Sequence, residues 1–185
     1  TKASTAQYTY TFAGWSLTEN GSVVNLTTQT ISKATTYYAV FTSTVNKYEI
    51  TWKNWDGTIL KTEQVAYGTK PTYTGENPTK PSTEEKTYVF TGWTPEVVKV
   101  TKDATYTAIY TSTYKNYTVT FKDQNGEIIS QITDDYGNPL TVPTLPTVTG
   151  YTVSWNETPV TSIPGEDKEY NIVLTAMYTI TYENM

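Results

Sequence analysis

The chain has 185 residues, a formal net charge of −5, and neither cysteine nor histidine. The missing cysteines exclude disulfides and cysteine-based zinc sites, and the missing histidines remove the usual general base and the usual metal ligand. The acidic balance disfavours nucleic-acid binding, and no apolar run approaches the roughly 20 residues that cross a membrane.

Aromatic residues are abundant, with 17 Tyr, 5 Trp and 4 Phe. Aromatic and β-branched residues favour strands, and each aromatic side chain buries a large area. Apolar and polar residues alternate through much of the chain, and no segment shows a long helical period. The sequence therefore predicts a mainly β protein.

The chain repeats itself. Three features recur at one constant offset. The strand-like segment Tyr48–Lys53 recurs as Tyr117–Lys122, Gly57 recurs as Gly126, and Gly68, which follows a tyrosine, recurs as Gly137. We call this offset, from Tyr48 to Tyr117, the repeat spacing. Such a constant spacing indicates tandem copies of one small unit, which more often build length or avidity than one active site.

Four segments are expected in chain order. Residues 1–46 form the C-terminal half of a repeat, because Tyr10-Thr11-Phe12 matches Tyr88-Val89-Phe90. Residues 47–116 and 117–178 form two complete repeats. Residues 179–185 resemble the first strand of a further repeat, so we expect the chain to be part of a longer array of repeats.

Each complete repeat is predicted to hold four strands and a crossing loop. The first strand ends at a hairpin turn, where Asn125-Gly126 suits a type I′ turn with positive φ at both central residues. The second strand returns to the Tyr-Gly turn, and a proline-bearing loop follows that is unsuited to a central strand and is expected to hold one short helical turn. The third and fourth strands are Tyr88–Trp93 and Thr105–Tyr110, or Tyr151–Trp155 and Ile172–Tyr178.

Residues at equivalent positions are candidate structural anchors. Trp15, Trp93 and Trp155 occupy one place in three copies, and Trp52 stands where Phe121 stands. We interpret them as core anchors, with a sugar-stacking platform as the alternative for the first three. The remaining anchors are interpreted as turn glycines: Gly57, Gly126, Gly68 and Gly137.

Trp55 is the candidate ligand contact. It aligns with Gln124 in the hairpin turn and is therefore expected to be exposed. A large side chain on a turn tip can serve as a contact point for a glycan or protein. The alternative is that Trp55 packs on its own hairpin or on the preceding repeat, and both readings stay open.

No catalytic constellation is evident. Glu96, Glu157 and Asp167 lie in variable loops and do not recur in register, so no carboxylate pair for glycoside hydrolysis is indicated. The turn at 123–127 lacks the ligand spacing of a calcium loop, and no Lys–Asn pair for an isopeptide bond is evident. We therefore expect no enzyme activity, no metal and no cofactor.

These motifs resemble the Listeria–Bacteroides repeat family, also called the internalin B B-repeat family. The residues that carry the resemblance are Tyr88-Val89-Phe90-Thr91-Gly92-Trp93, Thr105-Tyr106-Thr107-Ala108-Ile109-Tyr110 and Tyr37-Tyr38-Ala39-Val40-Phe41. The third copy departs from the pattern, with Ser154 where the glycine stands. The resemblance implies β-grasp (ubiquitin-like) units in exported surface proteins of Gram-positive bacteria and their relatives, where such repeats serve as stalk or adhesion segments.

We therefore expect tandem repeats in an elongated rod, because the joints between repeats lack glycine and proline. The expected function is a structural spacer in an extracellular, cell-wall-attached surface protein, with adjacent repeats of the same chain as partners, no nucleic acid and no membrane insertion. The alternative is a module that binds a glycan or host protein by avidity across repeats. A third possibility is association between chains through an exposed strand edge.

Overall fold

The computed structural model describes residues 1–182. Strands make up 46% of the chain and helix 2%, which confirms the mainly β prediction. The chain divides into two compact units, one formed by Thr1–Thr79 with Phe90–Tyr110 and the other by Lys80–Val89 with the chain from Thr111 onward. The four segments expected from the sequence stay predictions. Residues 179–182 belong to no strand, and 183–185 lie outside the described residues.

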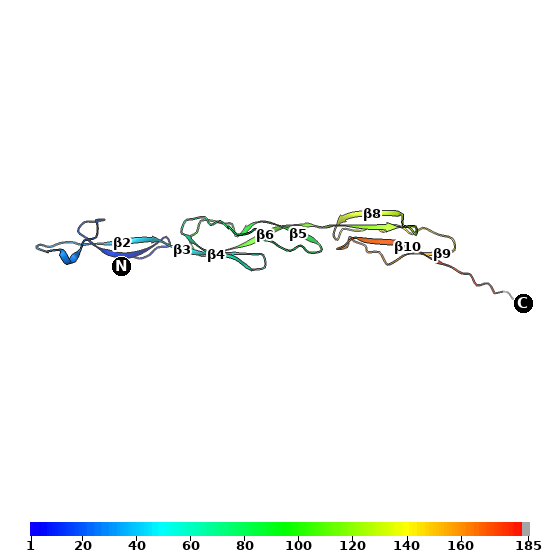
Figure 1. Ribbon diagram of the computed structural model, residues 1–185, viewed down its shortest axis with the longest axis horizontal. Helices are drawn as coiled ribbons and strands as arrows, with labels where there is room; N and C mark the ends of the chain where they lie inside the picture. Colours follow the sequence, from blue (N-terminus) through cyan, green and yellow to red (C-terminus); the bar gives the residue numbers. More distant parts are fainter. Residues whose placement is uncertain (183–185) are drawn as a thin grey trace. The chain divides into compact units, whose positions relative to one another are not determined.

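The first unit begins with a two-stranded antiparallel sheet of β1 (Tyr8–Ser16) and β2 (Tyr38–Val45) (Figure 1). The loop between these strands holds η1 (Leu26–Thr28), a single 3₁₀ turn capped by the Asn25 side chain. It is the one helical element within residues 1–182, so the helical turn expected in the proline-bearing loops is not formed there. No helix among the described residues is long and apolar enough to cross a membrane.

The next sheet is four-stranded, in the order β4-β3-β6-β5 (Figure 1). Its strands are β3 (Lys47–Lys53), β4 (Ile59–Ala66), β5 (Lys86–Thr94) and β6 (Ala104–Tyr114). β3 pairs antiparallel with β4 and parallel with β6. A parallel pair needs a long crossover, which here consists of β4, the proline-bearing loop and β5 instead of a helix.

The last sheet lies in the second unit and has the same topology, in the order β8-β7-β10-β9 (Figure 1). Its strands are β7 (Asn116–Lys122), β8 (Ile128–Asp135), β9 (Tyr151–Trp155) and β10 (Lys168–Ala176). β7 again pairs antiparallel with the second strand and parallel with the fourth. The β-grasp assignment implied by the resemblance stays a prediction.

In each four-stranded sheet, apolar residues at alternate positions of β3 or β7 are buried. Successive side chains of a strand point to opposite faces, so Val119 and Phe121 share one face of β7 and both are fully buried. Phe121 stacks on Tyr170 with ring centroids 5.3 Å apart. The second unit's core is Val119, Phe121, Leu140, Ile163 and Tyr170, and the first unit's is Ile50, Trp52, Val100 and Tyr106.

The loops that cover these cores are attached at the Tyr-Gly turn. The Gly68 N–H donates to the Val100 oxygen at 2.7 Å, and the Gly137 N–H donates to the Ile163 oxygen at 2.9 Å. Both glycines have positive φ, +80° and +81°, which suits a residue without a Cβ. The loop residues Val100 and Ile163 are thereby held over the aromatic cores.

The hairpin turns differ from the expected type I′. Only the glycine has positive φ, +87° at both Gly57 and Gly126, and Asn125 does not. The Gly126 N–H donates to the Asp123 oxygen, and the register shifts between Phe121 and Lys122. This is the pattern of a longer hairpin loop that ends in a left-handed glycine and a bulge. The Asp123 carboxylate accepts from the backbone N–H groups of Asn125 and Glu127, which favours this loop over the two-residue turn.

Candidate functional site

Asn46 is the single residue between β2 and β3 in the first unit. Its backbone N–H donates to the Gln7 oxygen at 2.9 Å, and its backbone oxygen accepts from the Tyr67 N–H at 2.8 Å. Its side-chain Nδ2 donates to the Thr5 oxygen at 2.9 Å, and Oδ1 accepts from the Thr9 hydroxyl at 2.7 Å. The connection is therefore bonded through both its backbone and its side chain.

Lys115 is the corresponding single residue between β6 and β7 in the second unit. Its N–H donates to the Glu85 oxygen at 2.8 Å, and its oxygen accepts from the Tyr136 N–H at 2.8 Å. Lys115 follows Asn46, and Tyr136 follows Tyr67, at the repeat spacing. The same backbone hydrogen bonds therefore close both connections.

A tyrosine hydroxyl completes each connection. Tyr48 Oη donates to the Ala6 oxygen at 2.7 Å, and Tyr117 Oη donates to the Glu84 oxygen at 2.6 Å. Both tyrosines occupy the second position of the strand that follows the connection. We call these two sets the first joint (Ala6, Gln7, Asn46, Tyr48 and Tyr67) and the second joint (Glu84, Glu85, Lys115, Tyr117 and Tyr136).

Cation–π contacts recur beside the joints. The Lys2 ammonium lies 4.0 Å from the centre of the Tyr10 ring, and that of Lys80 lies 4.1 Å from the Tyr88 ring. In both pairs the same interval of sequence separates the lysine from its tyrosine. At such exposed sites each contact contributes about 0.5–1 kcal/mol.

Four of the five aromatic anchors predicted from the sequence pack in the cores. Trp52 is 1% exposed and Phe121 is fully buried. The half-buried Trp93 packs on Trp52 with ring centroids 4.7 Å apart, and Trp155 packs on Phe121 at 5.1 Å. Their rings therefore contact the cores, and because both remain half-buried, sugar stacking at Trp93 and Trp155 stays an open alternative.

Trp15 departs from the expectation that it closes a core. It is 39% exposed and contacts Phe12 at 5.5 Å between ring centroids. β1 and β2 form a sheet of two strands, and neither buried cluster found among the described residues includes Trp15. A residue at the same place in the repeat is therefore a core anchor only where a first strand such as β3 or β7 lies beside it.

The sequence predicted no counterpart of Asp167 in the other complete repeat. In the structure, Asp103 makes the equivalent hydrogen bond there. The Asp167 carboxylate accepts from the Thr118 N–H at 2.7 Å, and Asp103 accepts from the Glu49 N–H at 2.8 Å. Thr118 follows Glu49 at the repeat spacing, whereas Asp167 follows Asp103 at a shorter one. The loop before Asp167 is shorter, so comparison at one fixed offset missed this structural role.

Lys122, Glu169 and Asn171 lie together, although the sequence showed no Lys–Asn pair. Lys122 and Asn171 are partners in the parallel β7–β10 register. Lys122 Nζ lies 2.6 Å from one Glu169 oxygen, and Asn171 Nδ2 lies 3.2 Å from the other. The hydrogen bonds from Lys122 and Asn171 hold the pKa of Glu169 below its ordinary value. The group is therefore a surface ion pair with an ionised carboxylate.

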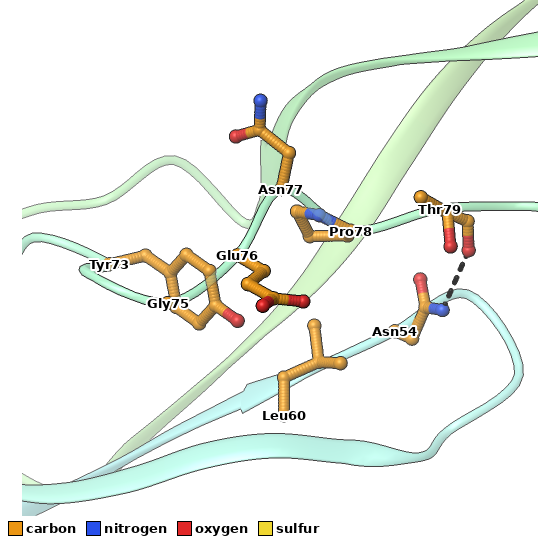
Figure 2. A pocket seen from close by; sticks show the side chains of 8 residues that line it. All are labelled: Asn54, Leu60, Tyr73, Gly75, Glu76, Asn77, Pro78 and Thr79. Atoms are coloured by element: carbon orange, nitrogen blue, oxygen red, sulfur yellow. Dashed lines mark hydrogen bonds between the residues drawn. The ribbon is translucent and has the colours of Figure 1, made fainter.

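Besides the two joints, the structure offers a second candidate site, a hollow in the first unit with a volume of about 370 Å³. Figure 2 shows its lining residues: Asn54, Leu60, Tyr73, Gly75, Glu76, Asn77, Pro78 and Thr79. They come from the β3–β4 hairpin and from the proline-bearing loop. The hollow lies where the hairpin tip meets that loop.

Asn54 holds the hairpin tip against the loop. Its Nδ2 donates to the Thr79 oxygen at 3.0 Å, as Figure 2 shows. Its Oδ1 accepts from the Tyr110 hydroxyl at 2.6 Å and from the Trp55 N–H at 2.9 Å. Burial, and after it the charge of Asp56, raise the pKa of Tyr110, so its hydroxyl stays protonated and able to donate.

Trp55, the candidate ligand contact, is 45% exposed and adjoins Asn54 in sequence. It is not one of the residues that line the hollow. The structure therefore leaves both readings of Trp55 open. Sequence reasoning missed the hollow itself. The available signal was that the copies differ there, because Val142 and Leu145 follow Tyr73 and Glu76 at the repeat spacing.

Within residues 1–182, no group of three or more Asp, Glu, His or Cys side chains is placed to hold a metal ion. Glu157 forms an exposed ion pair of 3.3 Å with Lys168. Asp167 is engaged by the Thr118 N–H. Glu157 and Asp167 thus have structural partners.

Comparison with known proteins adds little to this picture. No protein-family model matches the chain, so its resemblance to the Listeria–Bacteroides repeats stays a prediction. No curated protein matches it either.

Two solved structures are similar to the chain. One comprises Streptococcal High Identity Repeats in Tandem (SHIRT) domains 3-4 from a cell surface protein, with 20% identity over 70% of this chain and 99% of that one, at a TM-score of 0.33. The other is the type 2 repeat of the mucus binding protein MUB from Lactobacillus reuteri, with 15% identity over 70% of this chain and 100% of that one, at a TM-score of 0.19. Both are repeat domains of bacterial proteins, but at these TM-scores the likeness carries no argument about function.

Proposed function

We propose that the chain is a stretch of tandem repeats that acts as a structural spacer, without catalysis, in an extracellular, cell-wall-attached bacterial surface protein. The observation that carries the proposal is the recurrence of the joint. The same backbone bonds and the same tyrosine hydroxyl close the Asn46 connection and the Lys115 connection. The Gram-positive origin, the β-grasp assignment and the Listeria–Bacteroides resemblance belong to this proposal.

A spacer needs connections that keep their geometry. A residue whose N–H and oxygen are both bonded has lost most of its backbone freedom, and Asn46 and Lys115 are both in that state. A Gly/Ser-rich linker would instead behave as a random coil. The joints therefore support a chain in which each repeat is held firmly by its neighbour, and the partners of each repeat are adjacent repeats of the same chain.

The pattern of recurrence also favours a spacer over the alternative of a glycan- or host-protein-binding module. Avidity requires the same contact in successive copies. The residues that recur belong to cores, turns and joints, whereas the exposed turn tip carries Trp55 in one copy and Gln124 in the next. The repeated residues are therefore those that form the core, the turns and the joints of each β unit.

Small-angle X-ray scattering of the whole chain tests this proposal. We expect the scattering of an elongated particle, and a Gly-Ser-Gly-Ser insertion after Lys115 should broaden the distribution of interatomic distances. The same insertion between Gln124 and Asn125, in an exposed hairpin turn, is the control and should leave the distribution nearly unchanged. Scattering typical of a compact globule from the unmodified chain would overturn the spacer function.

A further inference from the structure

We propose that the hollow beside Asn54 is a binding site for a neutral saccharide. This inference goes beyond the spacer function and does not depend on it. The hollow's volume of about 370 Å³ falls in the lower part of the range of roughly 300–1,000 Å³ that is typical of small-molecule sites. Its walls combine apolar and polar groups from two segments of the first unit.

The apolar part of the wall suits the C–H face of a sugar ring. It is formed by the half-buried Leu60, the buried Pro78 and the Tyr73 ring. The Tyr73 ring packs on Trp52 at 5.6 Å and on Trp93 at 4.9 Å between centroids, so the core fixes its position. A rigid aromatic surface loses little conformational entropy on binding.

The polar part of the wall suits sugar hydroxyls, which both donate and accept hydrogen bonds. In Figure 2 the Glu76 carboxylate points into the hollow beside Tyr73 and above Leu60. Among the described residues, neither the Glu76 carboxylate nor the Tyr73 hydroxyl makes a hydrogen bond within the chain. Asn54 has a second amide N–H beyond the one bonded to Thr79, and its orientation is set by Tyr110.

Gly75 packs closely against the Tyr73 hydroxyl. A Cβ placed on Gly75 would lie 2.3 Å from Tyr73 Oη, so any larger residue would press on the hydroxyl. The loop backbone therefore approaches this oxygen as closely as a glycine allows. A hydroxyl held at a fixed place beside an open hollow is a suitable partner for a ligand hydroxyl.

Other classes of ligand fit less well. A metal ion needs several oxygen ligands, and the described residues include no cluster of acidic groups that could supply them. An anion would meet the charge of Glu76 in the wall of the hollow. A wholly apolar ligand would bury the carboxylate without a partner. A neutral molecule rich in hydroxyls satisfies both parts of the wall.

The other complete copy supplies an internal control. Val142 stands where Tyr73 stands and packs against the second core, and Leu145 stands where Glu76 stands. These replacements remove both free polar groups. A saccharide that recognises the hollow therefore distinguishes two copies that share one fold.

Amide NMR spectra of the whole chain test the proposal. The probes are glucose, galactose, mannose and N-acetylglucosamine, each added up to about 50 mM, because one shallow site is expected to bind with a millimolar Kd. We expect at least one sugar to shift the amide signals of Asn54, Gly75, Glu76 and Asn77, with no matching shifts around Val142 and Leu145. The shifts should saturate with sugar concentration.

Two variants test the polar wall. Glu76→Gln and Tyr73→Phe should each weaken binding about fivefold or more. The first replaces a charged acceptor by a neutral amide, and the second removes one partner of a ligand hydroxyl. Glu96→Gln, a carboxylate removed elsewhere on the surface, should bind as the parent chain does, and thermal unfolding should show that all three variants fold. The proposal is overturned if no sugar shifts these signals, if Glu76→Gln and Tyr73→Phe bind unchanged, or if the region 142–145 responds equally.

Discussion

The hydroxyl of Tyr117 donates a 2.6 Å hydrogen bond to the backbone oxygen of Glu84, a residue 33 positions earlier in the chain. Tyr48 makes the corresponding 2.7 Å bond to Ala6 across 42 positions. The loop between β1 and β2 is longer than the one between β5 and β6, which accounts for the difference. Surface loops tolerate insertions, whereas the contact that the two copies share is kept.

Removing that hydroxyl should loosen the second joint. Tyr117→Phe keeps the ring and deletes one partly exposed hydrogen bond, so we expect a loss of about 0.5–1 kcal/mol in the free energy of unfolding. The amide of Lys115 should exchange its hydrogen several times faster. Tyr178→Phe, at a residue that is 90% exposed, is the control. Unchanged exchange at Lys115 in Tyr117→Phe would show that the hydroxyl does not hold the joint.

Truncation of Phe121 should be the most damaging single change in the second unit. Its ring is fully buried and packs on Tyr170 and Trp155. Phe121→Ala should lower the free energy of unfolding by about 3–5 kcal/mol, through lost burial and a cavity. Phe12→Ala, at a ring that is 50% exposed, should lower it by only about 1 kcal/mol. Chemical denaturation of both variants checks this, and similar losses would contradict the placement of the core.

The left-handed glycine of the hairpin turn can be tested without any packing change. Gly126 has φ +87°, and a Cβ there would have no atom within 4 Å. Gly126→Ala should therefore destabilise the unit by about 1–2 kcal/mol through backbone strain alone. Gly126→Asn should destabilise it less, because asparagine tolerates this region. Thermal unfolding measures both, and a larger loss for asparagine would contradict the explanation.

Glu63 should make the stability of the first unit depend on pH. Partial burial raises the pKa of Glu63, but hydrogen bonds from Lys61 and Trp52 Nε1, together with the Lys61 charge, outweigh it, so the net pKa lies below its ordinary 4.5. The ionised form therefore stabilises the folded state, fully above about pH 4.5, and this contribution is lost as pH falls through the lowered folded pKa.

The matching measurement compares the parent chain with Glu63→Gln. The variant should be less stable by about 1 kcal/mol at pH 7, because it loses a half-buried ion pair and the charge on a hydrogen bond. The difference should shrink as pH is lowered from 5 toward 3. A difference that stays constant with pH would rule out the ionised carboxylate as its source.

The Lys122, Glu169 and Asn171 group should remain unlinked. An isopeptide bond would join Lys122 Nζ to the Asn171 side-chain carbon and release ammonia, a step that needs a neutral amine and a proton for the leaving group. The lowered pKa of Glu169 leaves it without that proton, and both Lys122 and Glu169 are open to water. Intact-mass spectrometry should give the mass of the printed sequence, and a loss of one ammonia would contradict this reading.

Individual residues show which features could be predicted from the sequence and which could not. The strand β9 has the predicted bounds Tyr151–Trp155, because period-two alternation with aromatic ends is a strong strand signal. The hairpin turn at Gly126 was correctly located but wrongly typed, since Asp123 captures nearby N–H groups and favours the longer loop. The role of Asp167 was missed because its counterpart lies at a different offset. The hollow was missed because no repeated residue marks it.

The sequence by itself determined the β class, the repeat, the turn glycines and the aromatic side chains that form the cores, because these depend on local periodicity and on backbone conformations that few residues adopt. Only the tertiary structure decided which strands pair in parallel, that a single bonded residue connects β6 to β7, and that Trp15 is exposed where Trp93 is packed. These outcomes depend on partners far away in the chain, such as Glu84 for Tyr117. A local pattern shows what a residue can do, and the neighbours that the fold brings to it decide what it does.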